Sequence, residues 1–159
     1  MQQPHRTYTV DEARVRLERY CAMEDRCHKQ VEEKLREMNL IPEAVDQILY
    51  HLLTNNYLNE ERFARTFARS KFNQKQWGKN RIIRELKMRD ISKFNIDAAL
   101  TEIEDKKYYE VFDTLSRKRL AQINKEPNKY KKRKKLADYL LYRGWPSDWI
   151  YEKAKELIP

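Results

Sequence analysis

Two groups of Lys and Arg residues have a type and spacing suited to a chemical role. Their positive side chains could neutralise anionic groups on a partner. In the first group, residues 59–89, ten Lys and Arg stand against three Asp and Glu, a net charge of +7. Three of the arginines are spaced i, i+3 and i+7 and therefore share one face of a helix. We expect a binding surface for an anionic partner, with a solvated helix face as the alternative. Its members are Arg62, Arg65, Arg69, Lys71, Lys79, Arg81, Arg84, Lys87 and Arg89.

The second group is a basic run near residue 130. Residues 105–143 hold 13 Lys and Arg against five Asp and Glu, a net charge of +8. Cations in such a run neutralise phosphates and release counterions, and Tyr130 within it could stack on a base. We expect weak, sequence-independent contact with single-stranded DNA, and a solvated helix start is again the alternative. The basic residues of the run are Lys129, Lys131, Lys132, Arg133, Lys134 and Lys135.

Composition indicates that helices must position both groups. Only two glycines and five prolines occur in 159 residues, 37% of the residues are charged, and the net charge is +9. Such a chain favours long helices and lacks turn residues for a sheet.

Three residues that could end a helix, which we call helix stops, recur at similar spacing and indicate a repeat. Asn39, Asp90 and Gly144 each follow a leucine by four positions and precede an apolar residue, at offsets of 51 and 54 residues. Asn, Asp and Gly tolerate the left-handed conformation that ends many helices.

An apolar stripe follows each stop at the same distance, as in Val45, Leu49 and Leu52. Thr9, Asn59 and Ser92 suit N-caps, and Pro42 and Pro146 suit a first helical turn. The sequence predicts an all-α fold, an elongated and curved tandem array of three three-helix repeats. The repeats would cover 10–55, 56–104 and 105–158, after a tail over 1–9. The nine helices expected are 10–23, 26–38, 42–54, 59–73, 77–89, 93–104, 105–124, 129–143 and 147–157.

Other functional classes find little support in the sequence. A glycine-rich phosphate loop is excluded by the glycine count, and His5, His28 and His51 have no evident nucleophile beside them in the sequence. Cys21, Cys27 and His28 lack zinc-site spacing. We therefore expect no enzyme activity, cofactor or metal. No segment predicts a membrane span or a signal peptide, which favours a cytoplasmic protein with reduced thiols. The aromatic residues of the third repeat favour core contacts, with a partner groove as the alternative: Tyr108, Tyr109, Tyr139, Tyr142, Trp145, Trp149 and Tyr151.

One segment resembles a known family. Asn56-Tyr-Leu-Asn-Glu-Glu-Arg-Phe-Ala64, followed by Trp77-Gly-Lys79, Arg81-Ile82 and Glu85-Leu86, is similar to the RecX pattern, and the similarity extends over most of residues 10–158. Family members usually have glycine at the first two stops, where this chain has Asn39 and Asp90. The basic run over 129–135 is also stronger than the pattern demands.

The resemblance implies a function without catalytic residues or cofactors. RecX proteins lie in the helical groove of a RecA–single-stranded DNA filament and lower its recombination, ATPase and coprotease activities. We expect the same partner here, bound by a monomer. A helical DNA-binding protein or transcription regulator is the alternative, and a preference for one duplex sequence would distinguish it.

Overall fold

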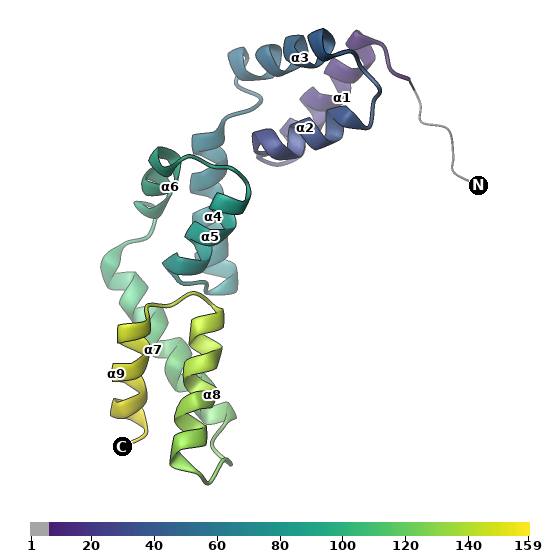
Figure 1. The fold of residues 1–159 in the computed structure, drawn as a ribbon. Helices are drawn as coiled ribbons and strands as arrows, with labels where there is room; N and C mark the ends of the chain where they lie inside the picture. Colours follow the sequence, from purple (N-terminus) through teal and green to yellow (C-terminus); the bar gives the residue numbers. More distant parts are fainter. Residues whose placement is uncertain (1–6) are drawn as a thin grey trace, which may run out of the picture.

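The computed structural model describes residues 7–159, which form nine α-helices and no strand (Figure 1). Residues 1–6, which include His5 and most of the predicted tail, lie outside the described part. Helix content and order agree with the prediction, and most helix ends agree within two residues. The helices are α1 (Val10–Met23), α2 (His28–Arg36), α3 (Pro42–Thr54), α4 (Glu60–Lys75), α5 (Lys79–Met88), α6 (Lys93–Leu100), α7 (Asp105–Gln122), α8 (Lys129–Tyr142) and α9 (Ser147–Leu157).

The three predicted helix stops are confirmed by the backbone. Asn39, Asp90 and Gly144 have φ values of 52°, 58° and 92°. After the second and third stops, the next apolar residue turns back: the N–H of Ile91 donates to the carbonyl of Leu86, and that of Trp145 to Leu140, at 3.1 and 3.2 Å. Each of these bonds satisfies a carbonyl that the end of a helix would otherwise leave without a partner.

The helix starts follow the sequence with one exception. Thr9, Asn59 and Ser92 each accept a backbone N–H of the first turn, and Pro42 is the first residue of α3. α9 begins at Ser147 as predicted, but Pro146 is its N-cap and does not lie within the first turn. At the other end, α6 stops at Leu100 rather than 104. Residues 101–103 continue as a tighter turn whose N–H groups bond three residues back.

We call α1–α3 unit 1, α4–α6 unit 2 and α7–α9 unit 3. Figure 1 shows the units following one another along a bent, elongated molecule, with unit 1 leaning away from the axis of the other two. The described residues form two apolar cores. One, built around Leu17, Val31, Leu35, Ile48 and Leu52, lies within unit 1. The other runs without a break through units 2 and 3.

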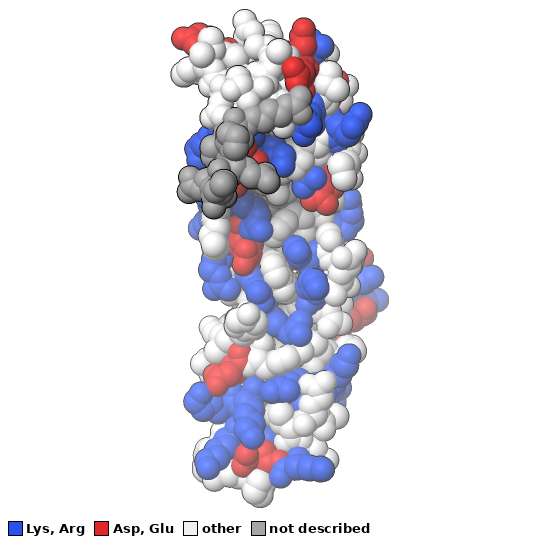
Figure 2. Space-filling model, turned by 90° about the vertical axis from the view of Figure 1, so that its right-hand side faces the viewer, with Lys and Arg blue, Asp and Glu red and all other residues white. Residues whose placement is uncertain are grey.

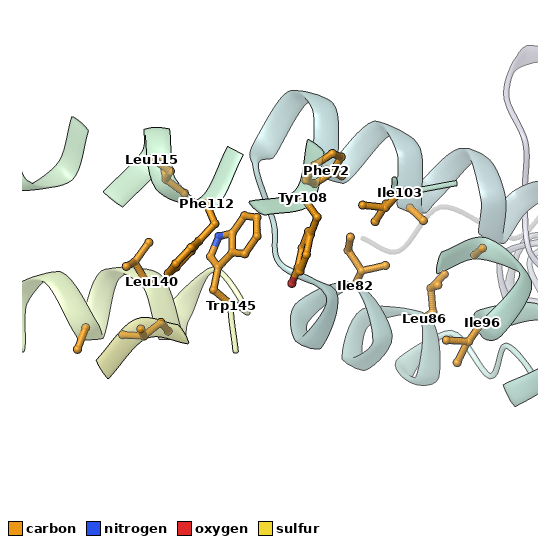
Figure 3. Packing of buried hydrophobic residues seen from close by; sticks show 14 of the residues in the cluster. Phe72, Ile82, Leu86, Ile96, Ile103, Tyr108, Phe112, Leu115, Leu140 and Trp145 are labelled. Atoms are coloured by element: carbon orange, nitrogen blue, oxygen red, sulfur yellow. The ribbon is translucent and has the colours of Figure 1, made fainter. Parts of the chain in front are cut away.

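An aromatic stack joins units 2 and 3. The Tyr108 ring lies 6.0 Å from that of Phe72 and 4.6 Å from that of Trp145, and Phe112 follows at 5.4 Å from Trp145 (Figure 3). The prediction that the aromatic residues of the third repeat make core or unit-to-unit contacts is confirmed for Tyr108 and Trp145, which are buried. Tyr142 and Tyr151 are exposed.

Polar contacts join units 1 and 2. Asp25, between α1 and α2, accepts from Arg62 Nε at 2.7 Å and from the Thr66 hydroxyl at 3.0 Å. The backbone N–H of His28 donates to Glu60 at 3.1 Å. Cys27 is the one residue of unit 1 that joins the larger core. The contact between units 1 and 2 is therefore formed mainly by charged hydrogen bonds, and the contact between units 2 and 3 by buried aromatic rings.

Candidate partner-binding surface

The arginines of α4, predicted to share one helix face in the first basic group, are engaged within the chain. Besides Asp25, Arg62 bonds the carbonyls of Asn56 and Tyr57, both at 3.1 Å. Its guanidinium thus fixes the loop before α4 as well as the joint to unit 1. Arg62 therefore stabilises the fold, and few of its N–H groups remain available to a partner.

Arg65 and Arg69 share a carboxylate. Glu102 lies 3.0 Å from Arg65 Nη1 and 3.3 Å from Arg69 Nη1, and Glu61 lies 3.2 Å from Arg65 Nη2. The hydrogen bond from Arg65 holds the pKa of Glu102 below its usual value. Arg62, Arg65 and Arg69 line a shallow hollow of about 320 Å³ together with Glu61 and Glu102. These two carboxylates and Asp25, which pairs with Arg62, balance the three arginines. The unneutralised positive charge of residues 59–89 therefore lies on side chains other than these three arginines.

The cations of α5 are less neutralised. Arg84 and Lys87 are exposed and make no ion pair within the described part of the chain. Lys79 is 3.6 Å from Asp105 and lies over the Tyr108 ring at 4.7 Å. Lys71, at the end of α4, has no carboxylate partner among residues 7–159 and lies 5.2 Å from the Trp77 ring. Three of these positive side chains thus belong to α5 and one to the last turns of α4.

Arg81 is held between two rings. Its guanidinium carbon lies 4.1 Å from the Trp77 ring centre and 4.6 Å from that of Tyr142, and Nη1 donates to the Tyr142 carbonyl at 3.3 Å. Tyr142 is 71% exposed, so the ring shields one side of a cation at the surface. Stacking fixes the direction of the guanidinium while leaving its charge unneutralised. No local pattern of the sequence indicates this partner, because Tyr142 lies 61 positions from Arg81.

The basic run occupies the first two turns of α8. Asn128 caps the helix by accepting the N–H groups of Tyr130 and Lys131. Lys134 pairs with Asp138 at 2.6 Å and Lys135 with Glu126 at 2.7 Å. Arg133 donates to the carbonyl of Ile158 at 2.8 Å. Within the described residues, Lys129, Lys131 and Lys132 have no carboxylate partner.

These charges stand against the helix dipole. Five of the nine described helices carry an acidic residue in the first turn, whereas α2, α5, α6 and α8 have none there. Of these four, α5, α6 and α8 begin with Lys. Positive charge at a helix N-terminus is unfavourable by about 0.3–1 kcal/mol per charge, so the cations at the starts of α5 and α8 do not stabilise their own helices.

The two helices follow each other along the long axis. The end of α8 abuts the start of α5, where Gly78 N–H donates to the carbonyl of Arg143 at 2.8 Å. At 1.5 Å per residue the pair spans about 35 Å. The side of the molecule drawn in Figure 2 shows more Lys and Arg than Asp and Glu. We call the set Lys71, Arg81, Arg84, Lys87, Lys129, Lys131 and Lys132 the basic strip.

Other chemistries find no site in the described residues. No group of three or more His, Cys, Asp and Glu side chains there has metal-binding geometry. Cys21 and Cys27 are free, buried thiols, and burial raises the pKa of both. In residues 7–159, no helix combines the length and apolar character of a membrane span.

Two family models match the chain, described as "RecX, second three-helix domain" over residues 59–100 and "RecX, third three-helix domain" over residues 106–153. The regulatory protein RecX of Haemophilus influenzae strain PittEE is 30% identical over 120 residues, which cover 75% of this chain and 77% of that protein. The chain belongs to the RecX family. RecX relatives are named regulatory proteins, and all seven residues of the basic strip lie within the two matched RecX domains.

Further RecX proteins support the same assignment. The RecX of Clostridioides difficile strain 630 is 28% identical over 137 residues, 84% of this chain but only 62% of that longer protein. Two solved structures share the fold. A crystal structure of regulatory protein RecX has a TM-score of 0.81 at 24% identity, covering 92% of this chain and 73% of that one. RecX from Lactobacillus salivarius has a TM-score of 0.79 at 23% identity, covering 94% and 96%.

Proposed function

We propose that this chain is a non-enzymatic regulator that binds the RecA–single-stranded DNA filament, in its helical groove, and lowers its recombinase, ATPase and coprotease activities. The observation that carries the proposal is the basic strip, a set of cations without ion pairs in residues 7–159, most of them on two helices that follow each other over about 35 Å, in a member of the RecX family. An extended cationic surface is complementary to an extended anionic filament and speeds encounter with it.

The mechanism we infer is restraint within the groove. Units 2 and 3 share one apolar core, so we expect the strip to present its charges in a fixed arrangement. A rigid arc that contacts several filament subunits at once gains avidity. It opposes the changes in subunit arrangement that the filament needs for ATP turnover. The chain acts as a monomer, at a cytoplasmic filament.

The direct test adds the purified chain to RecA filaments preformed on single-stranded DNA and follows ATP hydrolysis and filament length together. Wild type should lower hydrolysis. The double variant Arg84→Glu/Lys87→Glu changes two exposed side chains that make no ion pair in residues 7–159, and we expect at least tenfold weaker inhibition. Lys106→Glu/Lys107→Glu on α7 makes the same charge change outside the strip and should change inhibition less than twofold.

The outcomes separate the proposal from its rivals. If wild type leaves hydrolysis unchanged, filament regulation is wrong. If both double variants lose inhibition equally, net charge and not the strip is responsible.

A second candidate function is direct DNA binding, favoured by the exposed Tyr130 ring beside Lys129 and Arg133. We propose that the run over 129–135 adds weak, sequence-independent affinity for single-stranded DNA to filament binding. A transcription regulator would instead prefer one duplex by orders of magnitude at matched salt. Competition between specific and random duplexes in a mobility-shift titration distinguishes the two.

A further inference from the structure

A groove between α8 and α9 lies at the far end of unit 3 and takes no part in the basic strip. Its floor is formed by the buried Ala137 and Ala154, one from each helix, and Tyr151 forms a wall. The volume is about 340 Å³. Because alanines leave no side chain between the two helices, the groove reaches down to their packed interface. It is deep enough to take large apolar side chains.

The rim of this groove is positive. Arg133, Lys134 and Lys155 line it, and its one carboxylate, Asp138, is already paired with Lys134 at 2.6 Å. Lys155 makes no ion pair in the part of the chain that the structure describes. Arg133 Nε donates to the carbonyl of Ile158 at 2.8 Å, which holds the guanidinium in place.

We propose that this groove binds a short segment of a partner protein in which one or two large apolar side chains are flanked by Asp or Glu. The apolar floor takes the side chains, and the cationic rim pairs with the flanking carboxylates. An amphipathic peptide helix laid in a groove presents its anchors in this way. Base edges would find few hydrogen-bonding groups on the alanine floor, so the groove favours a peptide over DNA. The proposal stands apart from filament binding and does not require it.

The experiment uses the full chain, labelled with ¹⁵N, and a synthetic peptide in which Leu and Phe are flanked by Glu and Asp. Titration should move backbone amide signals of α8 and α9 around Ala137, Tyr151 and Ala154, and leave those of α2 and α5 in place. Two control peptides separate the contributions. One replaces Leu and Phe by Ser and keeps the acids, and the other replaces the acids by Lys and keeps the apolar pair. Neither should bind measurably.

Two exposed positions give variants that fold. Tyr151 is 55% exposed, and Tyr151→Ala removes the wall, so we expect about tenfold weaker binding. Lys155→Glu reverses a rim charge and should weaken binding about fivefold, with the effect shrinking as salt rises. Lys118→Glu on α7 is the matched control, because Lys118 is exposed and does not line the groove. It should bind as wild type does.

Three results would overturn the proposal. The acidic peptide without apolar residues could move the same signals as strongly, which would reduce the effect to general charge attraction. The shifts could fall on α5 instead of the groove. A single-stranded oligonucleotide of matched charge could also bind the groove more tightly than the peptide, which would make it a nucleic-acid site. Because no RecA is present, failure here leaves the filament proposal untouched.

Discussion

Gly78 and Gly144, the only two glycines of the chain, lie against each other at the joint between units 2 and 3. A Cβ atom added to Gly78 would stand 2.3 Å from the carbonyl oxygen of Gly144, and one added to Gly144 would stand 2.3 Å from Arg81 Cβ. The closeness lets two backbone bonds cross the joint, Gly78 N–H to Arg143 and Asn80 N–H to Gly144, at 2.8 and 3.0 Å. The start of α5 is thus capped by carbonyls at the end of α8.

The first prediction is that Gly78→Ala opens this joint. The new methyl group must displace backbone, not a flexible side chain, so we expect a loss of about 2–3 kcal/mol in the free energy of unfolding. Urea unfolding followed by circular dichroism measures it. Asn80→Ala, an exposed substitution two residues on that keeps the backbone N–H, should cost less than about 0.5 kcal/mol. Equal stability of Gly78→Ala and wild type would show that the glycine contact is dispensable.

The second prediction concerns the polar joint between units 1 and 2. Arg62→Ala leaves Asp25 without its main cation and frees the loop before α4, at a cost of about 1–3 kcal/mol. Because unit 1 has its own core, the loss should appear as faster amide hydrogen exchange in α1–α3, while α4–α9 keep their protection. Arg69→Ala removes one exposed ion pair and should change exchange little. Uniformly faster exchange would contradict two separate cores.

The third prediction is an acid-sensitive contact in unit 3. Lys153 is 3% exposed, and its Nζ lies 2.8 Å from Asp113, 3.0 Å from Glu156 and 3.0 Å from the Tyr109 hydroxyl. The hydrogen bonds from Lys153 and Arg117 hold the pKa of Asp113 below its ordinary 3.8. A lowered carboxyl pKa contributes stability above the unfolded value, and that stability is lost as pH falls through the folded value.

Unfolding free energy measured against pH should therefore fall below about pH 4 in wild type, and part of that fall should vanish in Asp113→Asn. The variant should also lose about 1–3 kcal/mol at neutral pH, because it weakens the pairing of a buried lysine. Asp138→Asn, at an exposed pair, is the control and should cost less than about 0.5 kcal/mol. Parallel pH curves for wild type and Asp113→Asn would exclude this carboxyl as the source.

The fourth prediction tests the phosphate contacts of α8. Each phosphate neutralised on single-stranded DNA adds about 0.7 to the slope of log affinity against log salt. Lys131→Gln/Lys132→Gln should therefore lower that slope by about 1.4, measured by anisotropy of a labelled oligonucleotide. Lys106→Gln/Lys107→Gln on α7 removes the same charge elsewhere and should leave the slope unchanged. An affinity insensitive to salt would exclude phosphate contact altogether.

Local signals in the sequence predicted most of the fold. Asn39, Asp90 and Gly144 end helices through their own backbone preferences, and Thr9, Asn59 and Ser92 start them with side-chain oxygens, so short windows were enough. Gln76 also adopts a left-handed conformation, with φ at 56°. No local preference indicates that. Gln76 ends α4, where the N–H of Trp77 donates back to Lys71 at 3.2 Å, and its carbonyl accepts from Trp145 Nε1, 69 positions away, at 3.2 Å, so a tertiary contact supports the conformation.

The candidate site could be predicted only in part for the same reason. Counting charges along residues 59–89 located a basic segment, but the count cannot show that Asp25 and Glu102 lie against Arg62, Arg65 and Arg69. These carboxylates stand 33–37 positions away. Only the three-dimensional arrangement of the helices distinguishes the exposed cations of α5 from the arginines of α4, which are paired within the chain. Residue type locates charge, and packing decides whether that charge remains available.

The cations at the starts of α5 and α8 favour binding of anionic partners but lower the thermal stability of the chain. Replacing Lys129 and Lys132 by Glu would place acids where the helix dipole favours them, gaining about 0.3–1 kcal/mol at each position. Random variants screened only for survival at raised temperature should therefore lose these lysines early. The survivors would melt later and hold polyanions less well, so thermal screening of this chain needs a second screen for binding.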